Sequence, residues 1–136
     1  MEERASYLIE PIESLGAGSF GLVEKIKLYN TRHYFCGLYA RKVLRPDASD
    51  PDLFTRFERE VRYQADCLHP NIVQIFICNL QAAQPWFVME LAESNLHDEI
   101  QKGTLTETEK INIVKMVLNA VGWIHQKGYL HRDIKP

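Results

Sequence analysis

Three glycines lie within six residues near the start of the chain, in the stretch Gly16-Ala17-Gly18-Ser19-Phe20-Gly21. Glycine lacks a Cβ, so a turn rich in it can bring backbone N–H groups against phosphate oxygens. The residues that follow show the period of a strand rather than of a helix, and no Gly-Lys-Ser/Thr closes the loop. The pattern favours a hairpin that covers a triphosphate, with an ordinary tight hairpin as the alternative.

A lysine and a glutamate farther along the chain could form an ion pair beside such a loop. Lys42 lies near the end of an apolar strand candidate. Glu60 comes one position before Val61 in an amphipathic segment, on or beside its apolar side, where a carboxylate is costly unless a cation meets it. Glu58 is the competing acid, although it falls farther around the helix. Lys42 is the candidate cation.

The elements that must position these residues are short strands with one inserted helix. Runs with strand character and turn residues between them predict five strands, over residues 7–15, 22–29, 35–44, 72–78 and 86–91. Glu24 is the one polar residue on the apolar side of the second run. Between the third and fourth runs, Asp50 can cap a helix that ends at His69-Pro70-Asn71. Its expected apolar stripe is Phe54, Phe57, Val61, Ala65 and Leu68.

After Glu90 the apolar period changes from two to 3.6, which predicts a helical region. Thr106 and Glu109 have the spacing of a capping box, and Gly128 supplies a stop. Between them, apolar residues recur at helical spacing at Ile111, Val114, Val117, Leu118, Val121 and Ile124. The order of elements indicates an α+β protein.

Four stretches, taken together, resemble the eukaryotic-type serine/threonine protein kinase domain. They are the glycine loop, the strand Tyr39-Ala40-Arg41-Lys42-Val43, the stretch Val88-Met89-Glu90-Leu91-Ala92, and the terminal Tyr129-Leu130-His131-Arg132-Asp133-Ile134-Lys135-Pro136. They occur in the family's order from about Tyr7 to Pro136. The resemblance implies a kinase N-lobe over residues 1–91, with a five-stranded antiparallel sheet and one helix. It also implies that residues 92–136 hold the hinge and the first C-lobe helices, ending in the catalytic loop.

The resemblance also implies a role for each site residue. Asp133 would orient the substrate hydroxyl and accept its proton, and Lys135 would neutralise charge on the γ-phosphate. Lys42 would reach the α and β phosphates of ATP and pair with Glu60, whose distance to His69 also matches the family. The remaining ATP contacts would be the apolar slot of Leu15, Val23 and Ala40, the loop residues Gly16, Ala17, Gly18, Ser19, Phe20 and Gly21, and the hinge residues Met89, Glu90 and Ala92.

Two departures from the family pattern are visible. The connection over residues 29–37 is longer than in many kinases, and the hinge reaches Leu96 about one residue early, which leaves Asn95 an uncertain ribose contact. The sequence as given also stops before the Asn and the Asp-Phe-Gly that bind Mg²⁺ in the family. The expectation is therefore an inactive piece of a kinase that uses ATP, Mg²⁺ and a protein substrate. The alternative is a non-catalytic nucleotide-binding or interaction module, either similar to a pseudokinase or completed by a second chain.

Composition narrows the class further. The chain has 136 residues, 46% of them hydrophobic and 25% charged, which suits one packed domain. A formal charge of −2 without a basic stripe argues against nucleic acid. No apolar run approaches a membrane span, so we expect a cytoplasmic protein. The three cysteines Cys36, Cys67 and Cys78 lack zinc or disulfide spacing and are expected to be buried thiols. An apolar helix face without its partner would favour association.

Overall fold

The computed structural model describes residues 6–17, 21–45, 51–131 and 134. The chain forms two compact units, one of residues 1–66 with 74–91 and the other of residues 67–73 with 92–136. The structure therefore groups the short segment 67–73 with the second unit. The boundary expected after residue 91 stays a prediction.

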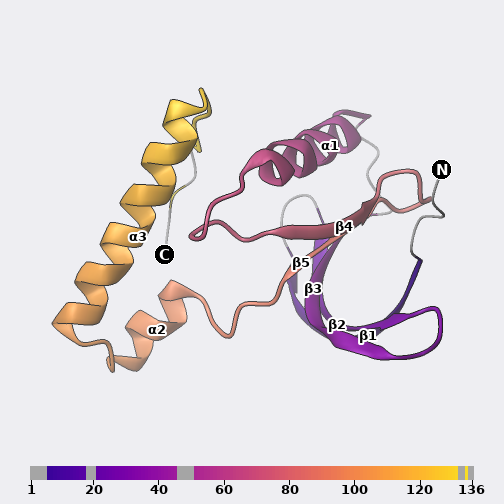
Figure 1. The fold of residues 1–136 in the computed structure, drawn as a ribbon, viewed down its shortest axis with the longest axis horizontal. Helices are drawn as coiled ribbons and strands as arrows, with labels where there is room; N and C mark the ends of the chain where they lie inside the picture. The colour runs from indigo at the N-terminus through magenta and orange to yellow at the C-terminus, as the bar shows by residue number, and fades with distance from the viewer. Residues whose placement is uncertain (1–5, 18–20, 46–50, 132–133, 135–136) are drawn as a thin grey trace. The chain divides into compact units, whose positions relative to one another are not determined.

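The first unit is a five-stranded antiparallel sheet with one helix, as the sequence predicted (Figure 1). The strand order is β1-β2-β3-β5-β4, and helix α1 (Pro51–Asp66) lies between β3 and β4 in the sequence. The strands are β1 (Tyr7–Ala17), β2 (Gly21–Asn30), β3 (Phe35–Leu44), β4 (Ile75–Asn79) and β5 (Trp86–Glu90). The α+β fold class is confirmed.

One face of this sheet, called here the helix face, packs against α1. Phe57 and Val61 of the helix are buried together with Leu44 of β3 and Phe87 of β5. Phe57 and Phe87 lie with their ring centroids 5.5 Å apart. Burying one side chain of this size contributes about 1.5–3 kcal/mol, so this cluster fixes the helix on the sheet.

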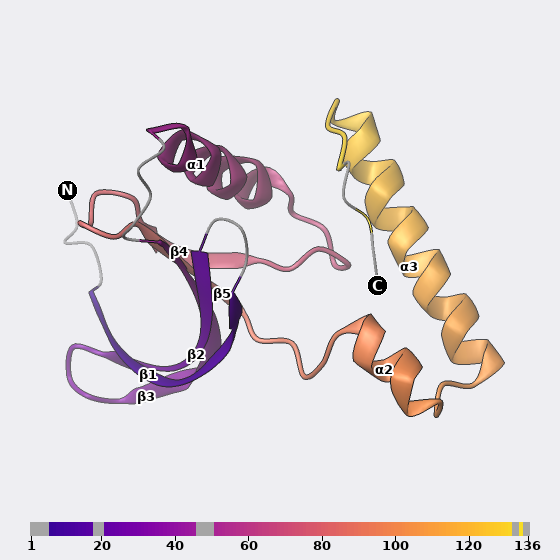
Figure 2. The same cartoon turned by 180° about the vertical axis from the view of Figure 1, so that it is seen from behind.

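The other face, called here the opposite face, holds a second apolar cluster built around Ile26, Leu28 and Val88, all fully buried. Phe76 of β4 lies 5.6 Å from the ring of Tyr7 on β1 and 5.4 Å from that of Tyr39 on β3. Since β1 and β4 are the two edge strands, the sheet curls around this cluster, and the curl of β1, β2 and β3 is visible from behind in Figure 2.

The structure corrects parts of the sequence-based boundaries. The fourth strand begins at Ile75 rather than at residue 72, because the N–H of Ile72 donates to His69 O at 3.1 Å and the turn continues. The predicted apolar stripe of α1 is only partly buried, since Phe57 and Val61 face the core whereas Ala65 is exposed and Phe54 and Leu68 are 38% and 73% exposed. The helix ends at Asp66, before Leu68 can join its face.

The expectation of three buried cysteines is wrong for two of them. Cys67 is buried, but Cys36 and Cys78 are exposed. Cys36 lies near the start of β3, beside the exposed turn over residues 31–34, and Cys78 lies on the edge strand β4. An edge strand and a hairpin end have neighbours on fewer sides, which leaves both thiols accessible.

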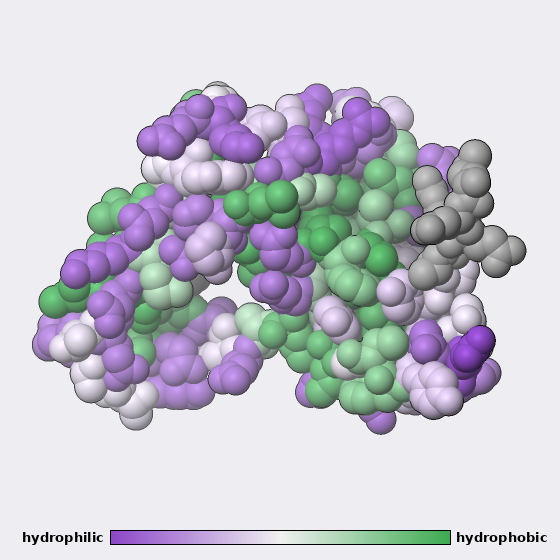
Figure 3. All heavy atoms as spheres, viewed as in Figure 1, coloured by the Kyte–Doolittle hydropathy of each residue, from purple (hydrophilic) through white to green (hydrophobic). Residues whose placement is uncertain are grey.

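The second unit contains helices α2 (Leu96–Lys102) and α3 (Glu107–Gln126). Thr106 caps α3 with both hydrogen bonds of the predicted capping box, each 3.1 Å long. Neither helix has a buried residue. On α3 the side chains of Ile111, Val114 and Leu118 are 54%, 56% and 64% exposed, and apolar surface is visible along this helix in Figure 3.

The segment 67–73 packs on α3 within the second unit. The Asn71 side-chain amide donates to Met116 O at 3.3 Å, and the ring of His69 lies 5.6 Å from that of Trp123. His69 Nδ1 also accepts from the N–H of Asn71 at 3.0 Å, which holds the turn. From the sequence, these residues are predicted only to end the preceding helix, and their contacts with α3 are not.

Candidate functional site

Four of the residues expected to contact a nucleotide lie together on the helix face. Val23 of β2 is directly opposite Lys42 of β3, and Ala40 of β3 is directly opposite Met89 of β5. Lys42 and Ala40 are two positions apart on one strand, so their side chains share a face. Ala40 is buried, and the other three are half-buried. The register of three strands therefore places Lys42 beside apolar side chains on one face, where Lys25 also lies, directly opposite Ala40.

Lys42 on this face is paired with a carboxylate from α1. Lys42 Nζ lies 2.8 Å from Glu60 Oε1, and the two side chains are 17% and 33% exposed. Of the two acids considered from the sequence, Glu60 meets Lys42, whereas Glu58 pairs with the exposed Arg62 one turn along the helix. Phe57 and Val61 flank Glu60 at helical spacing and are buried on the sheet, which directs the carboxylate to the same side.

The energies of these contacts differ in scale. A partly exposed ion pair contributes at most about 1 kcal/mol, because water screens the charges and two long side chains must be ordered. Burial of Phe57 contributes more. The helix is therefore held by its apolar side chains, and the ion pair orients Lys42 rather than holding the helix in place.

The glycine loop is described at its two ends. Gly16 and Ala17 end β1 and Gly21 begins β2, while the predicted contacts Gly18, Ser19 and Phe20 lie outside the described residues. A Cβ on Gly21 would lie 2.1 Å from the carbonyl oxygen of Val43, so only glycine allows β2 and β3 to approach here. Gly16 has φ +154° with nothing within 4 Å of an added Cβ, so its requirement is one of backbone conformation.

Other predicted site residues have more varied positions. Leu15 lies within the irregular pairing between Ser14 and Gly16 and is 47% exposed. Glu90 ends β5, and its N–H donates to Gln74 O at 3.2 Å. Ala92 is exposed, and it is the first residue of the segment 92–136 in the second unit. The predicted catalytic residues Asp133 and Lys135 lie outside the described residues.

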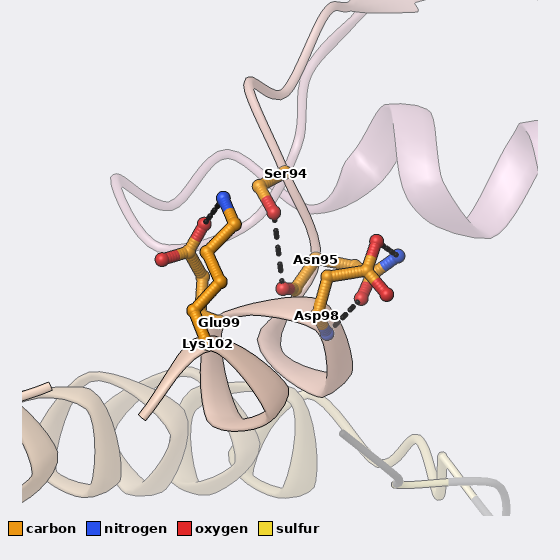
Figure 4. A network of polar contacts seen from close by, with 5 residues as sticks. All are labelled: Ser94, Asn95, Asp98, Glu99 and Lys102. Carbon is orange, nitrogen blue, oxygen red and sulfur yellow. Dashed lines mark hydrogen bonds and ion pairs between the residues drawn. The ribbon is translucent and has the colours of Figure 1, made fainter. Parts of the chain in front are cut away.

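Asn95, an uncertain ribose contact from the sequence, is the N-cap of α2. Its side chain accepts from Asp98 N at 2.8 Å and donates to Asp98 Oδ2 at 3.2 Å (Figure 4). At the next residue, the Ser94 hydroxyl and the Lys102 ammonium hold the pKa of Glu99 below its usual value. The Asn95 amide is thus engaged in capping, which is a structural use of the residue.

Sequence reasoning missed a second ion pair on the opposite face. Arg41, next to Lys42, donates from Nε to Glu24 Oε1 at 2.7 Å, and its guanidinium carbon lies 5.8 Å from the ring centroid of Trp86. The available signal was Glu24, the acid that interrupted the apolar side of its strand. A carboxylate on an apolar side predicts a cation on a neighbouring strand.

Two further features bear on cofactors and on the membrane. Across residues 6–17, 21–45, 51–131 and 134, no three side chains of His, Cys, Asp or Glu gather as a metal site would require. No helix in this same part of the chain is long and apolar enough to cross a membrane.

The chain is similar to known protein kinases along nearly its whole length. The family model for the protein kinase domain matches residues 9–136. The serine/threonine-protein kinase PknJ of Mycobacterium tuberculosis is 33% identical over 134 residues, which are 97% of this chain and 22% of that protein. A putative mitogen-activated protein kinase 14C of Drosophila melanogaster is 27% identical over 136 residues, covering 95% of this chain and 37% of that protein.

The fold is likewise similar to a solved kinase. The crystal structure of the Mycobacterium tuberculosis PknI kinase domain superposes with a TM-score of 0.70 at 28% identity, covering 94% of this chain and 52% of that one. The sheet with α1 corresponds to a kinase N-lobe, and the helices that follow correspond to the start of the C-lobe. The chain therefore spans about half of a kinase domain and belongs to the serine/threonine protein kinase family.

Proposed function

We propose that these residues are the ATP-binding half of a kinase domain that transfers the γ-phosphate of ATP to serine or threonine hydroxyls of a protein. The observation that carries this proposal is the Lys42–Glu60 pair, 2.8 Å long, on the face that also presents Val23, Ala40 and Met89. Phosphoryl transfer needs mainly positioning and charge neutralisation, and a lysine oriented by a helix glutamate serves both needs.

The proposed contacts divide between phosphates and base. Lys42 binds the α and β phosphates, and the backbone N–H groups of the loop over residues 16–21 cover the triphosphate. Val23 and Ala40, with Leu15, form the apolar cover of the adenine, and Met89 lines the inner end of the slot. The backbone groups of Glu90 and Ala92 bind the adenine edge. The shared face supports the roles of Lys42, Val23, Ala40 and Met89, and the kinase pattern alone supports the others.

The proposed chemistry uses the terminal motif. Asp133 accepts the proton of the attacking substrate hydroxyl while the hydroxyl oxygen forms a bond to the γ-phosphorus of ATP. The bond between that phosphorus and the β–γ bridging oxygen breaks, and ADP leaves. Lys135 neutralises charge on the transferred phosphoryl group. Magnesium ions, which the family uses, supply charge neutralisation on the phosphates when bound. We assign no residue of this chain as a magnesium ligand.

The 136 residues by themselves are proposed to bind ATP weakly and to transfer no phosphate. They span 52% of the PknI kinase domain, and phosphoryl transfer requires the metal-binding groups together with the catalytic loop. If this chain produces ADP or a labelled protein product, and the variant Asp133→Asn does not, that part of the proposal is overturned.

Calorimetric titration of the chain with ATP tests the binding half. Lys42→Met should weaken binding about tenfold or more, since a charge-assisted phosphate contact contributes roughly 1.5–3 kcal/mol. Lys115→Met on α3 is the matched control, because it is the same chemical change at a residue with no proposed role toward ATP, and it should leave the affinity unaltered. If the parent chain, Lys42→Met and Lys115→Met all bind ATP with the same affinity, the phosphate contact proposed for Lys42 is contradicted.

The catalytic part of the proposal is tested in a complete kinase domain that contains these residues. There, Asp133→Asn should lower kcat by several orders of magnitude, and the Kd for ATP should change little, because the residue acts on the hydroxyl and not on the nucleotide. Near-normal turnover in this variant would contradict the role given to Asp133.

A second candidate function, an interaction module, is favoured by α3. Its exposed apolar residues form a larger strip than a solvated helix needs. If the chain works by association, sedimentation should show a concentration-dependent assembly that Val114→Asp abolishes, while Lys115→Met leaves it intact. A monomer at all concentrations would exclude self-association through α3.

A further inference from the structure

Two neighbouring residues of β3 carry positive charges that lie on opposite faces of the sheet. Lys42 meets Glu60 on the helix face, whereas Arg41 meets Glu24 on the opposite face. The side-chain period of a strand is two, so a shift of β3 by one residue against β2 would exchange the two cations between the faces. Some feature of the sheet must decide which cation faces α1.

The apolar pattern of β3 decides this only weakly. Register is well specified where one face of a strand is apolar and the other polar. Here both faces are mainly small or apolar, with Leu38, Ala40 and Leu44 on the helix face and Gly37, Tyr39 and Val43 on the opposite face. Burial of the β3 side chains alone therefore discriminates only weakly between the observed and the shifted arrangements.

The contact between Arg41 and Glu24 has the features of a specific determinant. The two residues are directly opposite each other in the pairing of β2 with β3, and their side chains are 19% and 24% exposed. Both Nε and Nη2 of the arginine donate to Glu24 Oε1. The guanidinium also lies over the ring of Trp86, a stacking contact that a planar, delocalised cation makes better than an ammonium.

We infer that the Glu24–Arg41 pair sets the register of β3 and thereby selects Lys42 as the partner of Glu60. Both one-residue shifts break this arrangement. One shift places Arg41 opposite Val23, where Lys42 now lies. It leaves Glu24 opposite Ala40, without a cation directly across the strand.

The other shift also has an electrostatic penalty. It brings Glu24 opposite Lys42, but it places Arg41 opposite Lys25, a like charge. The observed register alone gives both carboxylates a cation and places no two cations directly opposite each other among these residues. Glu24 and Arg41 are thus positioning residues for Lys42, a conclusion that deepens the proposed function and rests on it for the role of Lys42 toward phosphate.

Disulfide trapping in the full chain measures the register without any nucleotide. With the three natural cysteines replaced by alanine, Leu22→Cys with Val43→Cys reports the observed pairing. Leu22→Cys with Lys42→Cys reports the shift that moves Arg41 opposite Val23. The yield of each disulfide after mild oxidation is read by mass spectrometry.

The charge reversal Glu24→Lys should lower the yield of the observed-register disulfide at least twofold and raise that of the shifted one. Adding Arg41→Glu restores opposite charges and should restore the parent yields, which a loss of packing alone would not do. Glu58→Lys, at the exposed pair with Arg62, is the control and should change neither yield. Parent-like yields in Glu24→Lys, or no recovery in the double variant, would overturn the inference.

If circular dichroism shows that Glu24→Lys does not fold, Glu24→Gln is read in the same way, because it keeps the side-chain size and removes the charge. These outcomes are independent of ATP. A chain with the expected disulfide yields and no affinity for ATP would refute the proposed function and leave the register inference standing.

Discussion

The two faces of the sheet have the same components joined in different ways. Each has a buried apolar cluster and one ion pair made by a cation of β3. On the opposite face both partners of the ion pair belong to the sheet, so strand pairing alone brings them together. On the helix face Glu60 belongs to α1, and its approach to Lys42 depends on how that helix is docked. The ion pair on the helix face can therefore be broken by moving α1 while the sheet stays folded.

The largest expected effect comes from loosening the helix. Phe57→Ala should lower the free energy of unfolding by about 3–5 kcal/mol, because a fully buried ring at the helix–sheet contact is lost. ATP affinity should fall as well, since Glu60 loses its position. Urea denaturation and calorimetry measure the two effects.

Ile26→Ala on the opposite face is the matched control for that variant. It should lower the free energy of unfolding by about 2–5 kcal/mol but retain ATP affinity in the molecules that remain folded. If Ile26→Ala reduces affinity as much as Phe57→Ala does, the two faces are coupled and the comparison fails.

Next in size is a change that disturbs both faces at once. Gly21→Ala places a methyl group against the backbone of Val43, which cannot rotate away, so β2 and β3 must separate. We expect a loss of about 1–3 kcal/mol in the free energy of unfolding. Gly122→Ala in α3 has open space around the added Cβ and should instead gain roughly 0.5–1 kcal/mol. Thermal unfolding of both variants gives the signs, and a stable Gly21→Ala would contradict the close approach.

A smaller effect should separate the two kinds of ion pair. A double-mutant cycle of Lys42→Met and Glu60→Gln, measured on ATP affinity, should show a coupling of about 1 kcal/mol, because each change removes the same interaction. The exposed pair Glu58–Arg62, replaced by glutamines in the same cycle, should show none. Additive losses at Lys42 and Glu60 would mean that the lysine acts without its glutamate.

The smallest effect concerns Tyr29, which belongs to β2. A hydrogen bond to Glu10 raises the pKa of Tyr29 above 10.0, assisted by burial and by the glutamate's charge. A raised pKa favours the protonated phenol, so this contribution to stability is present below pH 10 and is lost as the pH rises through the folded-state pKa. Ultraviolet titration should show Glu10→Gln lowering the pKa of Tyr29 toward 10, with Glu13→Gln leaving it in place.

The sequence predicted the sheet and its helix well, because period-two runs, turn residues and the stripe at Phe57 and Val61 all indicated the same elements. It predicted α3 through the local chemistry of Thr106 and Glu109. It failed where the outcome depends on neighbours distant in the chain. The exposure of Cys78 follows from strand order, which places β4 at an edge of the sheet. Two other misses are local, because Cys36 lies beside the exposed turn over residues 31–34 and the N–H of Ile72 donates to His69 O, which delays β4. The Glu24–Arg41 pair needed the register of two strands.

The irregular pairing of the edge strands has a consequence for solubility. Register shifts occur on β1 between Pro11 and Glu13 and between Ser14 and Gly16, and on β4 between Ile75 and Ile77. An edge strand normally offers a row of unpaired N–H and C=O groups to any other strand, which is the first step of aggregation. Bulges interrupt that row, and the curl that brings Tyr7 to Phe76 turns the two edges toward each other. The first unit thus limits edge-to-edge polymerisation through its backbone, in addition to the charges of Glu10 and Glu13 on β1.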